Sequence, residues 1–375
     1  MRILADENMP YVEALFAEHA QITTKAGRAI NADDLVDIDV LLVRSVTQVN
    51  RTLIAKANKL KYVGSATIGM DHVDQQALAE RDIRFSNAPG CNAVGVGQWV
   101  AQVLLTLADK SDEVLKGKKL AVIGAGNTGT AAAKCLQALG CDVRLCDPFK
   151  AASGDPRDFV SLDEALDDAD IVTCHVPLTK DGEYPTHYLL DRQRLESLKP
   201  NVWILNACRG AVIDNRALID WAKANPQARI ALDVWEGEPN PMPELADLVE
   251  IATPHIAGYS LEGKARGSYM LYQWLAPQLT WPAPNSLASL LPNPNQAPIT
   301  CSAAPSQSQL LSWCERVYDL DLDDRLFRQK AFETGGFDGL RKNHQPRREF
   351  SALTLVPKGK FEVNWLEQFG FSVGR

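Results

Sequence analysis

This chain of 375 residues lacks three features that would distinguish it from an ordinary globular protein. No run of about 18 apolar residues occurs, which is the length that a membrane-spanning helix needs. The N-terminus has no apolar leader segment. The eight cysteines never form a Cys-x-x-Cys pair, and their uneven spacing is typical of neither a disulfide framework nor a zinc site. We therefore expect a cytoplasmic protein with reduced thiols and no bound metal.

An excess of positive charge is also missing. Lys and Arg number 39 against 47 Asp and Glu, so the formal net charge is −8. Nucleic acids and acidic membrane surfaces attract proteins with a positive field, so neither is an expected partner. A small anionic substrate in a local basic pocket is still compatible with this charge. Hydrophobic residues make up 46% of the chain, and its length suggests two or three domains.

Strand and helix signals alternate along the chain, which is typical of parallel sheets with crossover helices. The segment DVLLVR at 39–44 is a continuous apolar run of the kind found in buried parallel strands. In the same part of the chain we expect a helix at 10–20 and further strands at 2–4, 60–64 and 83–86. A long helix is expected at 93–108. A second run then begins with an expected strand at 119–124, and further strands are expected at 142–146, 171–175, 203–206 and 230–234. Both runs predict doubly wound sheets.

The composition changes after a helix that we expect at 262–275. Six prolines between residues 281 and 308 predict an irregular linker. Beyond it we expect a small third α/β unit, with a helix at 309–318 and a strand at 350–356. The predicted fold class is therefore α/β, with two doubly wound parallel-sheet domains and a small C-terminal α/β domain.

A glycine-rich loop opens the second run. The strand at 119–124 leads into the sequence GAGNTG at 124–129, and a helix is expected at 130–139. Gly124 permits a tight turn, Gly126 lets the backbone approach a pyrophosphate, and Gly129 lets the helix pack on the strand. Asp147 ends the next strand, where its carboxylate can accept hydrogen bonds from both ribose hydroxyls. That carboxylate would repel a 2′-phosphate, so the motif favours NAD over NADP.

Three polar residues follow successive strands of this run, at the edge where open α/β sheets bind ligands. They are Arg209 in NACRG, Glu238 in DVWEGEP and His255 in PHIAG. A histidine can take the proton of an alcohol, a nearby carboxylate stabilises the imidazolium, and an arginine can bind a carboxylate with two hydrogen bonds. Each residue alone also fits a capping, packing or surface-turn role. A catalytic role is favoured because all three residues follow the dinucleotide motif in this order.

With these motifs in this order, the chain resembles the D-isomer-specific 2-hydroxyacid dehydrogenase family. The resemblance implies that Arg209 binds the substrate carboxylate, that Glu238 supports the histidine and that His255 is the acid/base. It also implies two Rossmann-like domains, which are a discontinuous substrate (lid) domain of 1–92 and 257–280 and an NAD-binding domain of 93–256. The complete set of predicted cofactor residues is Gly124, Gly126, Asn127, Thr128, Gly129, Asp147, His175, Ala207, Cys208, Asp233 and Gly258.

General members of the family lack a tail such as 281–375. The resemblance implies that this tail is the dimerisation domain of a homodimer, and that the substrate is a phosphorylated 2-hydroxy acid. The predicted substrate-binding residues are Arg44, Ser45, Thr67 and Tyr259.

Several questions stay open at the level of the sequence. Arg44 could neutralise the phosphate or form a salt bridge inside its domain. Arg347 and Arg348 of the tail could reach the phosphate or form ion pairs. The substrate could be another D-2-hydroxy acid, such as 3-phospho-D-glycerate, and an NAD-sensing binding module is a further alternative.

Overall fold

The structure is a computed structural model that describes residues 1–294, 296–345 and 347–374. Its contacts divide the chain into two compact units. Unit 1 comprises Met1–Asn92 and Ser260–Asn293, and unit 2 comprises Ala93–Tyr259 and Pro294–Arg375. The tail, for which we predicted a separate domain from residue 281, is grouped from residue 294 with unit 2.

Unit 1 is built on a five-stranded parallel sheet in the order β2-β1-β3-β4-β5. The strands are β1 (Arg2–Asp6), β2 (Gln21–Lys25), β3 (Val40–Val43), β4 (Tyr62–Ser65) and β5 (Arg84–Asn87). All four residues of β3 and of β4 are buried, as the apolar run at 39–44 predicts for the former. We did not predict β2, because its sequence QITTK is mostly polar and it lies at an exposed edge of the sheet.

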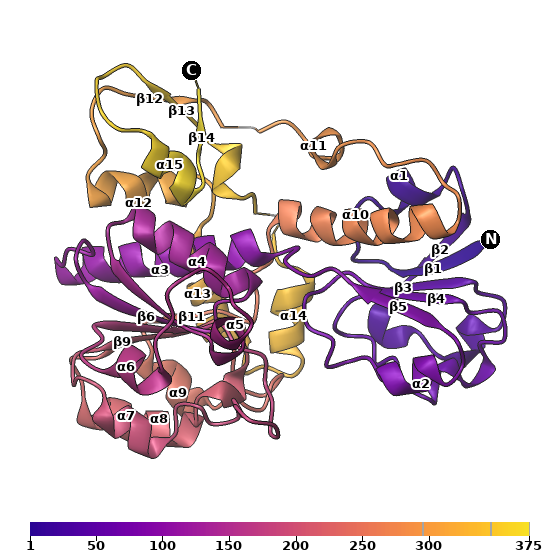
Figure 1. The fold of residues 1–375 in the computed structure, drawn as a ribbon, viewed down its shortest axis with the longest axis horizontal. Helices are drawn as coiled ribbons and strands as arrows, with labels where there is room; N and C mark the ends of the chain where they lie inside the picture. Colours follow the sequence, from indigo (N-terminus) through magenta and orange to yellow (C-terminus); the bar gives the residue numbers. More distant parts are fainter. Residues whose placement is uncertain (295, 346, 375) are drawn as a thin grey trace. The chain divides into compact units, whose positions relative to one another are not determined.

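Helices cover the sheet of unit 1. They are α1 (Val12–Phe16), α2 (Gln75–Ala79), α10 (Leu261–Gln278) and the short α11 (Leu287–Leu290). Figure 1 shows α10 running alongside this sheet, and its residues Leu271, Tyr272 and Leu275 share a buried cluster with Phe16 of α1. Short 3-10 turns complete the unit at Gly27–Ala29, Ala32–Leu35 and Leu53–Lys56.

Unit 2 contains a six-stranded parallel sheet in the order β11-β10-β9-β8-β6-β7. Its strands are β6 (Lys119–Ile123), β7 (Asp142–Cys146), β8 (Ile171–Cys174), β9 (Trp203–Asn206), β10 (Arg229–Leu232) and β11 (Ile251–Ala252). The chain order reverses between β6 and β8, and such a switch point is where doubly wound sheets bind ligands. The α/β class with parallel sheets that we predicted is confirmed.

The helices of this sheet are α3 (Ala93–Ser111), α4 (Asn127–Ala138), α5 (Pro148–Ala152), α6 (Leu162–Leu166), α7 (Arg192–Ser197), α8 (Asn215–Ala224) and α9 (Pro243–Leu248). A Cβ atom on Gly97 of α3 would lie 2.7 Å from the carbonyl carbon of Ala131 in α4. The glycine therefore lets these two helices pack closely. The helix α4 begins at Asn127, three residues before the predicted start, because the glycine-rich loop itself forms its first turn.

The tail forms a small parallel sheet of β12 (Ile299–Cys301), β13 (Thr354–Pro357) and β14 (Ser372–Val373). Its helices are α12 (Gln307–Glu315), α13 (Leu320–Lys330), α14 (Gly336–Lys342) and α15 (Asn364–Phe369). The strand β12 and the helix α11 lie inside the segment that we predicted to be irregular, so that prediction is wrong for these residues. Three residues between prolines carry no periodic signal, and β12 exists because β13 pairs with it from more than 50 positions further along.

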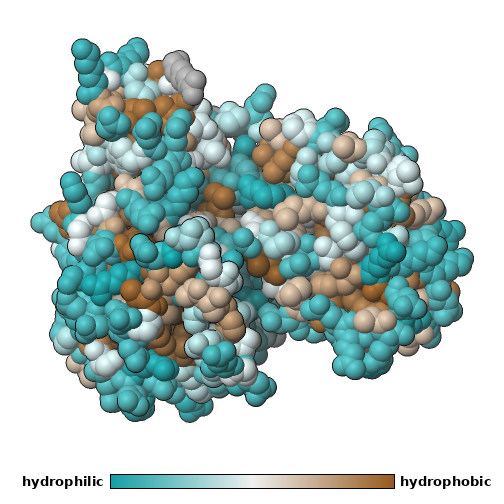
Figure 2. All heavy atoms as spheres, in the orientation of Figure 1, coloured by the Kyte–Doolittle hydropathy of each residue, from teal (hydrophilic) through white to brown (hydrophobic). Residues whose placement is uncertain are grey.

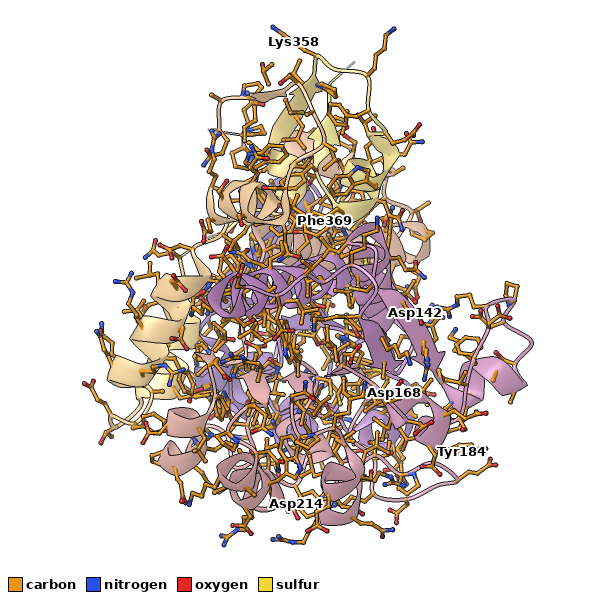
Figure 3. All side chains as sticks on the ribbon, turned by 90° about the vertical axis from the view of Figure 1, so that its left-hand side faces the viewer. Asp142, Asp168, Tyr184, Asp214, Lys358 and Phe369 are labelled. Carbon is orange, nitrogen blue, oxygen red and sulfur yellow. The ribbon has the colours of Figure 1, made fainter. Side chains whose placement is uncertain are left out.

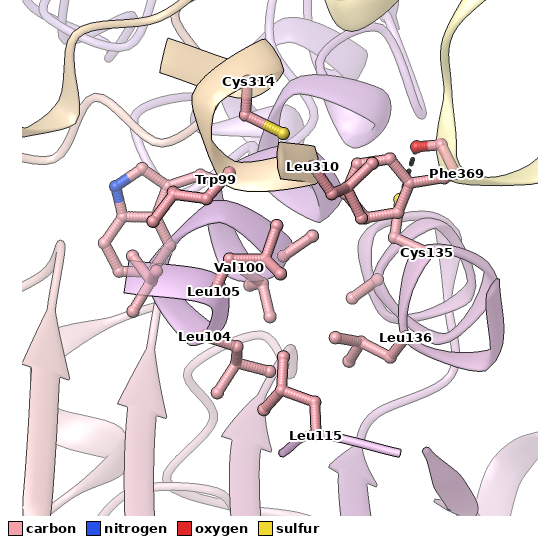
Figure 4. Close-up of a cluster of buried hydrophobic side chains, with 14 of the residues drawn as sticks. Trp99, Val100, Leu104, Leu105, Leu115, Cys135, Leu136, Leu310, Cys314 and Phe369 are labelled. Carbon is pink, nitrogen blue, oxygen red and sulfur yellow. Dashed lines mark hydrogen bonds between the residues drawn. The ribbon is translucent and has the colours of Figure 1, made fainter. Parts of the chain in front are cut away.

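The tail is anchored to the helices α3 and α4 by a continuous hydrophobic cluster. Figure 4 shows Leu310 and Cys314 of α12 packed over Trp99 and Val100 of α3. Phe369 lies beside α4, where its carbonyl oxygen accepts a hydrogen bond from Cys135 Sγ at 3.4 Å.

A second anchor protects an edge of the large sheet. Asp324 of α13 accepts a hydrogen bond from the backbone N–H of Ala252 in the edge strand β11, at 2.7 Å. Arg328 donates to the carbonyl oxygens of Ala246 and Val249 at 2.7 and 2.8 Å. The tail thus covers an edge that would otherwise be open to pairing with another strand.

The surface is that of an ordinary globular protein. Figure 2 shows hydrophilic residues over most of the visible face, and Figure 3 shows Lys358 at the outer end of the tail. Large exposed hydrophobic side chains, such as Val114 and Phe149, are scattered in the sequence. In the described part of the chain, no helix is both long enough and apolar enough to cross a membrane.

Candidate active site

The glycine-rich loop at the end of β6 has the geometry that a dinucleotide requires. Gly124 has a φ of +91°, and a Cβ atom there would lie 2.7 Å from the carbonyl oxygen of His175. A Cβ atom on Gly129 would lie 1.8 Å from the carbonyl oxygen of Gly124. A Cβ atom on Gly126 would meet nothing within 4 Å, so this residue faces open space at the N-terminus of α4. The loop therefore packs against other backbone at Gly124 and Gly129 and faces open space at Gly126, which fits a bound pyrophosphate.

Asp147 lies next to this loop, at the end of β7. Its Oδ2 accepts a hydrogen bond from the backbone N–H of Ala125 at 2.9 Å, and its Oδ1 accepts one from that of Lys150 at 3.0 Å. A carboxylate can accept about four hydrogen bonds, so capacity remains for ribose hydroxyls. The position therefore fits the predicted role.

Arg157 is a residue of this region that sequence reasoning missed. Its Nη2 donates to the carbonyl oxygen of Ala125 at 3.0 Å and its Nη1 to Thr130 Oγ1 at 2.8 Å. Asp155 holds it with two hydrogen bonds of 2.8 Å, and the guanidinium lowers the pKa of Asp155 to about 2. Arg157 therefore braces the glycine-rich loop from a distant segment, and no local motif could have indicated it.

His175 follows β8 on the other side of the switch point. It is 6% exposed, and burial lowers its pKa to about 4, so the ring is neutral at physiological pH. Its Nε2 lies 3.0 Å from Thr173 Oγ1, whereas its Nδ1 is buried without a hydrogen-bond partner among the described residues. An unpartnered ring nitrogen beside the glycine-rich loop fits a cofactor contact.

The Arg209 loop after β9 is held by a buried amide. Asn206 Nδ2 donates to the carbonyl oxygen of Arg209 at 2.9 Å, and Asn206 Oδ1 accepts from the backbone N–H of Cys208 at 3.1 Å. A Cβ atom on Gly210 would lie 1.9 Å from the carbonyl carbon of Trp235, so this loop touches the loop after β10. Asn206 is a positioning residue that sequence reasoning did not single out.

Asp233 organises the loop that carries the candidate acid/base. Its carboxylate is 1% exposed and accepts three hydrogen bonds, from Thr253 Oγ1 at 2.6 Å and from the N–H groups of Ile256 and Ala257 at 2.7 and 2.9 Å. The backbone N–H of His255 donates to the carbonyl oxygen of Asp233 at 2.6 Å. The side chain that we predicted to bind the cofactor thus also shapes the loop around His255.

His255 and Glu238 form a hydrogen-bonded pair. His255 Nδ1 lies 2.8 Å from Glu238 Oε2, and Glu238 Oε1 accepts from the backbone N–H of Trp235 at 2.9 Å. Burial by itself raises the pKa of Glu238, but the charge and hydrogen bond of His255 outweigh burial and hold that pKa below its ordinary value. The carboxylate therefore stays charged, and the ring keeps Nε2 for a substrate.

Tail residues surround the end of the same loop. Arg341 Nη2 donates to the hydroxyl of Tyr259 at 3.2 Å, and the ring of His344 packs edge-on against that of Tyr259. Arg347, which we considered for the substrate phosphate, is 7% exposed and donates to the carbonyl oxygen of Ala257. Its guanidinium lies 4.0 Å from the ring centroid of Tyr318. Arg347 thus supports the His255 loop through its hydrogen bond to Ala257.

The remaining predicted substrate residues belong to unit 1. Arg44 and Ser45 follow β3 and Thr67 follows β4, so all three are at one edge of the sheet. The backbone N–H of Ala66 donates to the carbonyl oxygen of Val43 at 2.9 Å and ties the two loops together. Contact of Arg44, Ser45 and Thr67 with substrate stays a prediction.

The cysteines do not supply a nucleophile. All eight are unpaired and buried. Burial raises the pKa of Cys208, beside the candidate site, to about 11 and that of Cys91 likewise to about 11. Both thiols are therefore protonated at physiological pH.

Comparison with known proteins decides the family. The chain is 56% identical over 372 residues to the erythronate-4-phosphate dehydrogenase of Shewanella baltica (strain OS185), with 99% of each chain covered. The protein belongs to the erythronate-4-phosphate dehydrogenase family. Residues 92–257 match the model of the NAD-binding domain of D-isomer specific 2-hydroxyacid dehydrogenases, and residues 290–370 match a domain of unknown function. The predictions of the family, of a dehydrogenase and of NAD as its cofactor are confirmed.

Solved structures agree with this fold. The chain resembles the TT0316 protein of Thermus thermophilus with 26% identity and a TM-score of 0.64, over 76% of this chain and 99% of the other. It also resembles the NAD-dependent formate dehydrogenase of Staphylococcus aureus in complex with NAD. The identity there is 24% and the TM-score 0.61, over 74% of this chain and 95% of the other.

The open space at Gly126 yields a first testable prediction. Gly126 is the N-cap of α4 with φ −71°, so Gly126→Thr keeps a conformation and a cap that threonine accepts. The added side chain would occupy the space of the pyrophosphate. We expect the Kd for NADH, measured by fluorescence titration, to rise by about tenfold or more, because overpacking costs roughly 1–3 kcal/mol. The thermal unfolding temperature of the ligand-free protein should stay near that of the wild type, and an unchanged Kd would place the pyrophosphate elsewhere.

The buried ring of His175 predicts a pH dependence of stability. Because its pKa is about 4 when folded and 6.5 ordinarily, only the unfolded state gains a proton between these values. Stability therefore falls as the pH falls, by about 2 kcal/mol between pH 7 and pH 5. His175→Asn cannot titrate, so its unfolding temperature should decrease less than that of the wild type over this range. Equal decreases in the two proteins would contradict the assignment.

Proposed function

We propose that the chain oxidises 4-phospho-D-erythronate at C2 to (R)-3-hydroxy-2-oxo-4-phosphooxybutanoate, as a step of pyridoxal 5′-phosphate (vitamin B6) biosynthesis. The observation that carries the proposal is the His255–Glu238 pair at 2.8 Å, beside an NAD-binding fold in a chain with full-length relatives named for this activity. The described residues supply an acid/base and a supporting carboxylate, which are the groups that alcohol oxidation requires from a protein.

The catalytic roles follow from the geometry of this pair. His255 Nδ1 is occupied by Glu238, so Nε2 is the atom that takes the proton of the C2 hydroxyl. Glu238 stabilises the imidazolium that forms. Arg209, whose loop touches the Glu238 loop, binds the substrate carboxylate and orients C2. NAD, when bound, accepts the hydride that leaves C2.

The residues that would hold NAD lie around the switch point of the large sheet. The loop Gly124–Gly129, with Asn127 and Thr128 at the start of α4, would bind the pyrophosphate through N–H groups. Asp147 would bind the adenosine ribose, and His175 would line the nicotinamide ribose. Backbone groups of Ala207, Cys208 and Gly258, together with Asp233, would surround the nicotinamide.

A substrate with a carboxylate and a phosphate needs a second anion site besides Arg209. We propose that Arg44, Ser45, Thr67 and Tyr259 contact the substrate. The Thr67 hydroxyl donates to the carbonyl oxygen of Gly69 at 2.9 Å, so it must turn to donate to an anion. Arg209 and Arg44 then supply local positive charge for the substrate, although the net charge of the whole chain is −8.

The single-turnover oxidation of two acids tests this function. The purified protein is mixed with NAD and either 4-phospho-D-erythronate or 3-phospho-D-glycerate, and bound NADH is followed by fluorescence. We expect much faster NADH formation with the four-carbon acid. His255→Ala should lower that rate by at least about 100-fold, because general acid–base catalysis contributes that much, while NADH still binds.

Each other outcome has a definite meaning. NADH formation with 3-phospho-D-glycerate alone would keep the mechanism and replace the substrate. No NADH with either acid, despite tight binding of NAD, would favour another 2-hydroxy acid or an NAD-sensing module. Full activity of His255→Ala would refute the assignment of the acid/base.

We also propose that the protein is a cytoplasmic homodimer that associates through its tail. The tail has its own small sheet, whose outer strands β12 and β14 each pair on one side only within the described residues. Light scattering on the full chain should give twice the chain mass, and a monomer at micromolar concentration would contradict the proposal.

A further inference from the structure

An arginine of the tail is aimed at the end of the His255 loop. Arg341 lies in the last turn of α14, and its Nη2 donates to the Tyr259 hydroxyl at 3.2 Å. Its guanidinium carbon is 5.9 Å from the centroid of the Tyr259 ring. Both contacts are to Tyr259, which lies four residues after His255 in the chain, and together they hold the guanidinium in place.

Two polar atoms at this place have no partner. Arg341 Nε and His344 Nδ1 are both buried and without a hydrogen bond in the described part of the chain. His344 packs against Tyr259 with ring centroids 5.9 Å apart, and its Nε2 is held by Asp323 Oδ2 at 3.0 Å. Buried polar atoms are almost always satisfied in proteins, so two unsatisfied ones at one tyrosine point to a ligand.

Among the described residues no hydrogen bond or ion pair joins Arg341 to a carboxylate, although the charges of Glu238 and Asp338 both act on it. Glu238 is the acidic group of the site, but both of its oxygens already accept hydrogen bonds, from His255 and from the N–H of Trp235. The charge of Arg341 is nevertheless felt there, since it is among the causes that hold the pKa of Glu238 low. The spot beside Tyr259 therefore has a guanidinium with an N–H that no described residue accepts.

Other cations of this region are already used. Arg347 donates to the carbonyl oxygens of Gly95 and Ala257, and its guanidinium lies over the ring of Tyr318. Arg328 is bound to Asp324 and to the carbonyl oxygens of Ala246 and Val249 at the end of α9. Arg347 Nη1 is also buried without a hydrogen bond among the described residues, but it belongs to a guanidinium already bound to two carbonyl oxygens. The unpartnered Nε of Arg341 instead lies next to a predicted substrate residue, Tyr259.

We propose that Arg341, positioned by Tyr259, binds the phosphate of the substrate, so that the tail takes part in substrate recognition. A phosphate monoester offers several acceptor oxygens, and the planar fork of arginine binds them with charge-assisted hydrogen bonds. The inference rests on the proposed function for the identity of the substrate, whereas the phosphate chemistry rests on these tail residues alone.

Three variants test the role of Arg341. Arg341→Gln removes the charge, Arg341→Lys keeps the charge without the fork, and Lys358→Ala removes a cation at the outer end of the tail as a matched control (Figure 3). Each full-length protein is saturated with NADH and titrated with inorganic phosphate by calorimetry. The KM and kcat for 4-phospho-D-erythronate are measured in parallel, with unphosphorylated D-erythronate as a competitive inhibitor.

We expect Arg341→Gln to raise the Kd for phosphate and the KM by about 10- to 100-fold, the usual effect of losing charged hydrogen bonds. The kcat and the inhibition constant of D-erythronate should change little, because neither depends on the phosphate contact. Arg341→Lys should lie between Arg341→Gln and the wild type, and Lys358→Ala should match the wild type. An unchanged Kd for NADH shows that the variants are folded.

Two results would overturn the inference. One is a wild-type protein that binds no phosphate, or an Arg341→Gln variant with unchanged phosphate affinity and KM. The other is an equal loss for D-erythronate with a shifted pH profile, because Arg341 would then act through Glu238 and His255. If the wild type binds phosphate but does not oxidise 4-phospho-D-erythronate, the proposed function fails, and the phosphate titration of Arg341→Gln still decides the role of Arg341.

Discussion

The candidate site depends on one buried carboxylate. Asp233 is almost inaccessible to solvent, and a charge in that position is tolerable only because three donors from residues 253–257 surround it. These bonds force the loop to wrap around the carboxylate, and His255 adopts a φ of +59° within it. Such a backbone costs roughly 1–3 kcal/mol in a residue with a side chain. The cost is offset by the Asp233 bonds, and the result is that Nδ1 of His255 meets Glu238.

The tail also supports this arrangement. Its aromatic residues share one cluster with α3 and α4, and Phe327 stacks on Trp235 with ring centroids 4.8 Å apart. Arg347 then reaches the carbonyl oxygen of Ala257, next to the last bond of the Asp233 network. The site loop is therefore held between a carboxylate that takes its N–H groups and a guanidinium that takes a carbonyl oxygen. This explains why the tail is grouped with the NAD-binding unit and does not stand apart.

Much of the framework was predictable from local patterns. Apolar runs such as 40–43 and 203–206 are buried strands, and the spacing of Gly124, Gly126 and Gly129 has a physical reason at each position. Segments that depend on distant partners were not predictable. The strand β12 has three residues and needs β13, and Arg157 needs the glycine-rich loop that it braces from another segment. Asn206 stands in a predicted motif, but its amide bonds to the Arg209 loop appear only in the structure.

By itself the sequence determined the α/β class, the dinucleotide motif and the order Arg209, Glu238, His255. Short segments are enough for this, because apolar runs indicate buried strands, glycine spacing indicates the turn, and residue type indicates acid–base chemistry. The tertiary structure alone decided which partners the cations of the tail have. Arg341 and Arg347 are both basic residues of one short stretch, and nothing local distinguishes them. Packing directs Arg347 to backbone carbonyl oxygens and Arg341 to Tyr259. Such a choice arises from contacts between segments some 90 residues apart, which no local pattern contains.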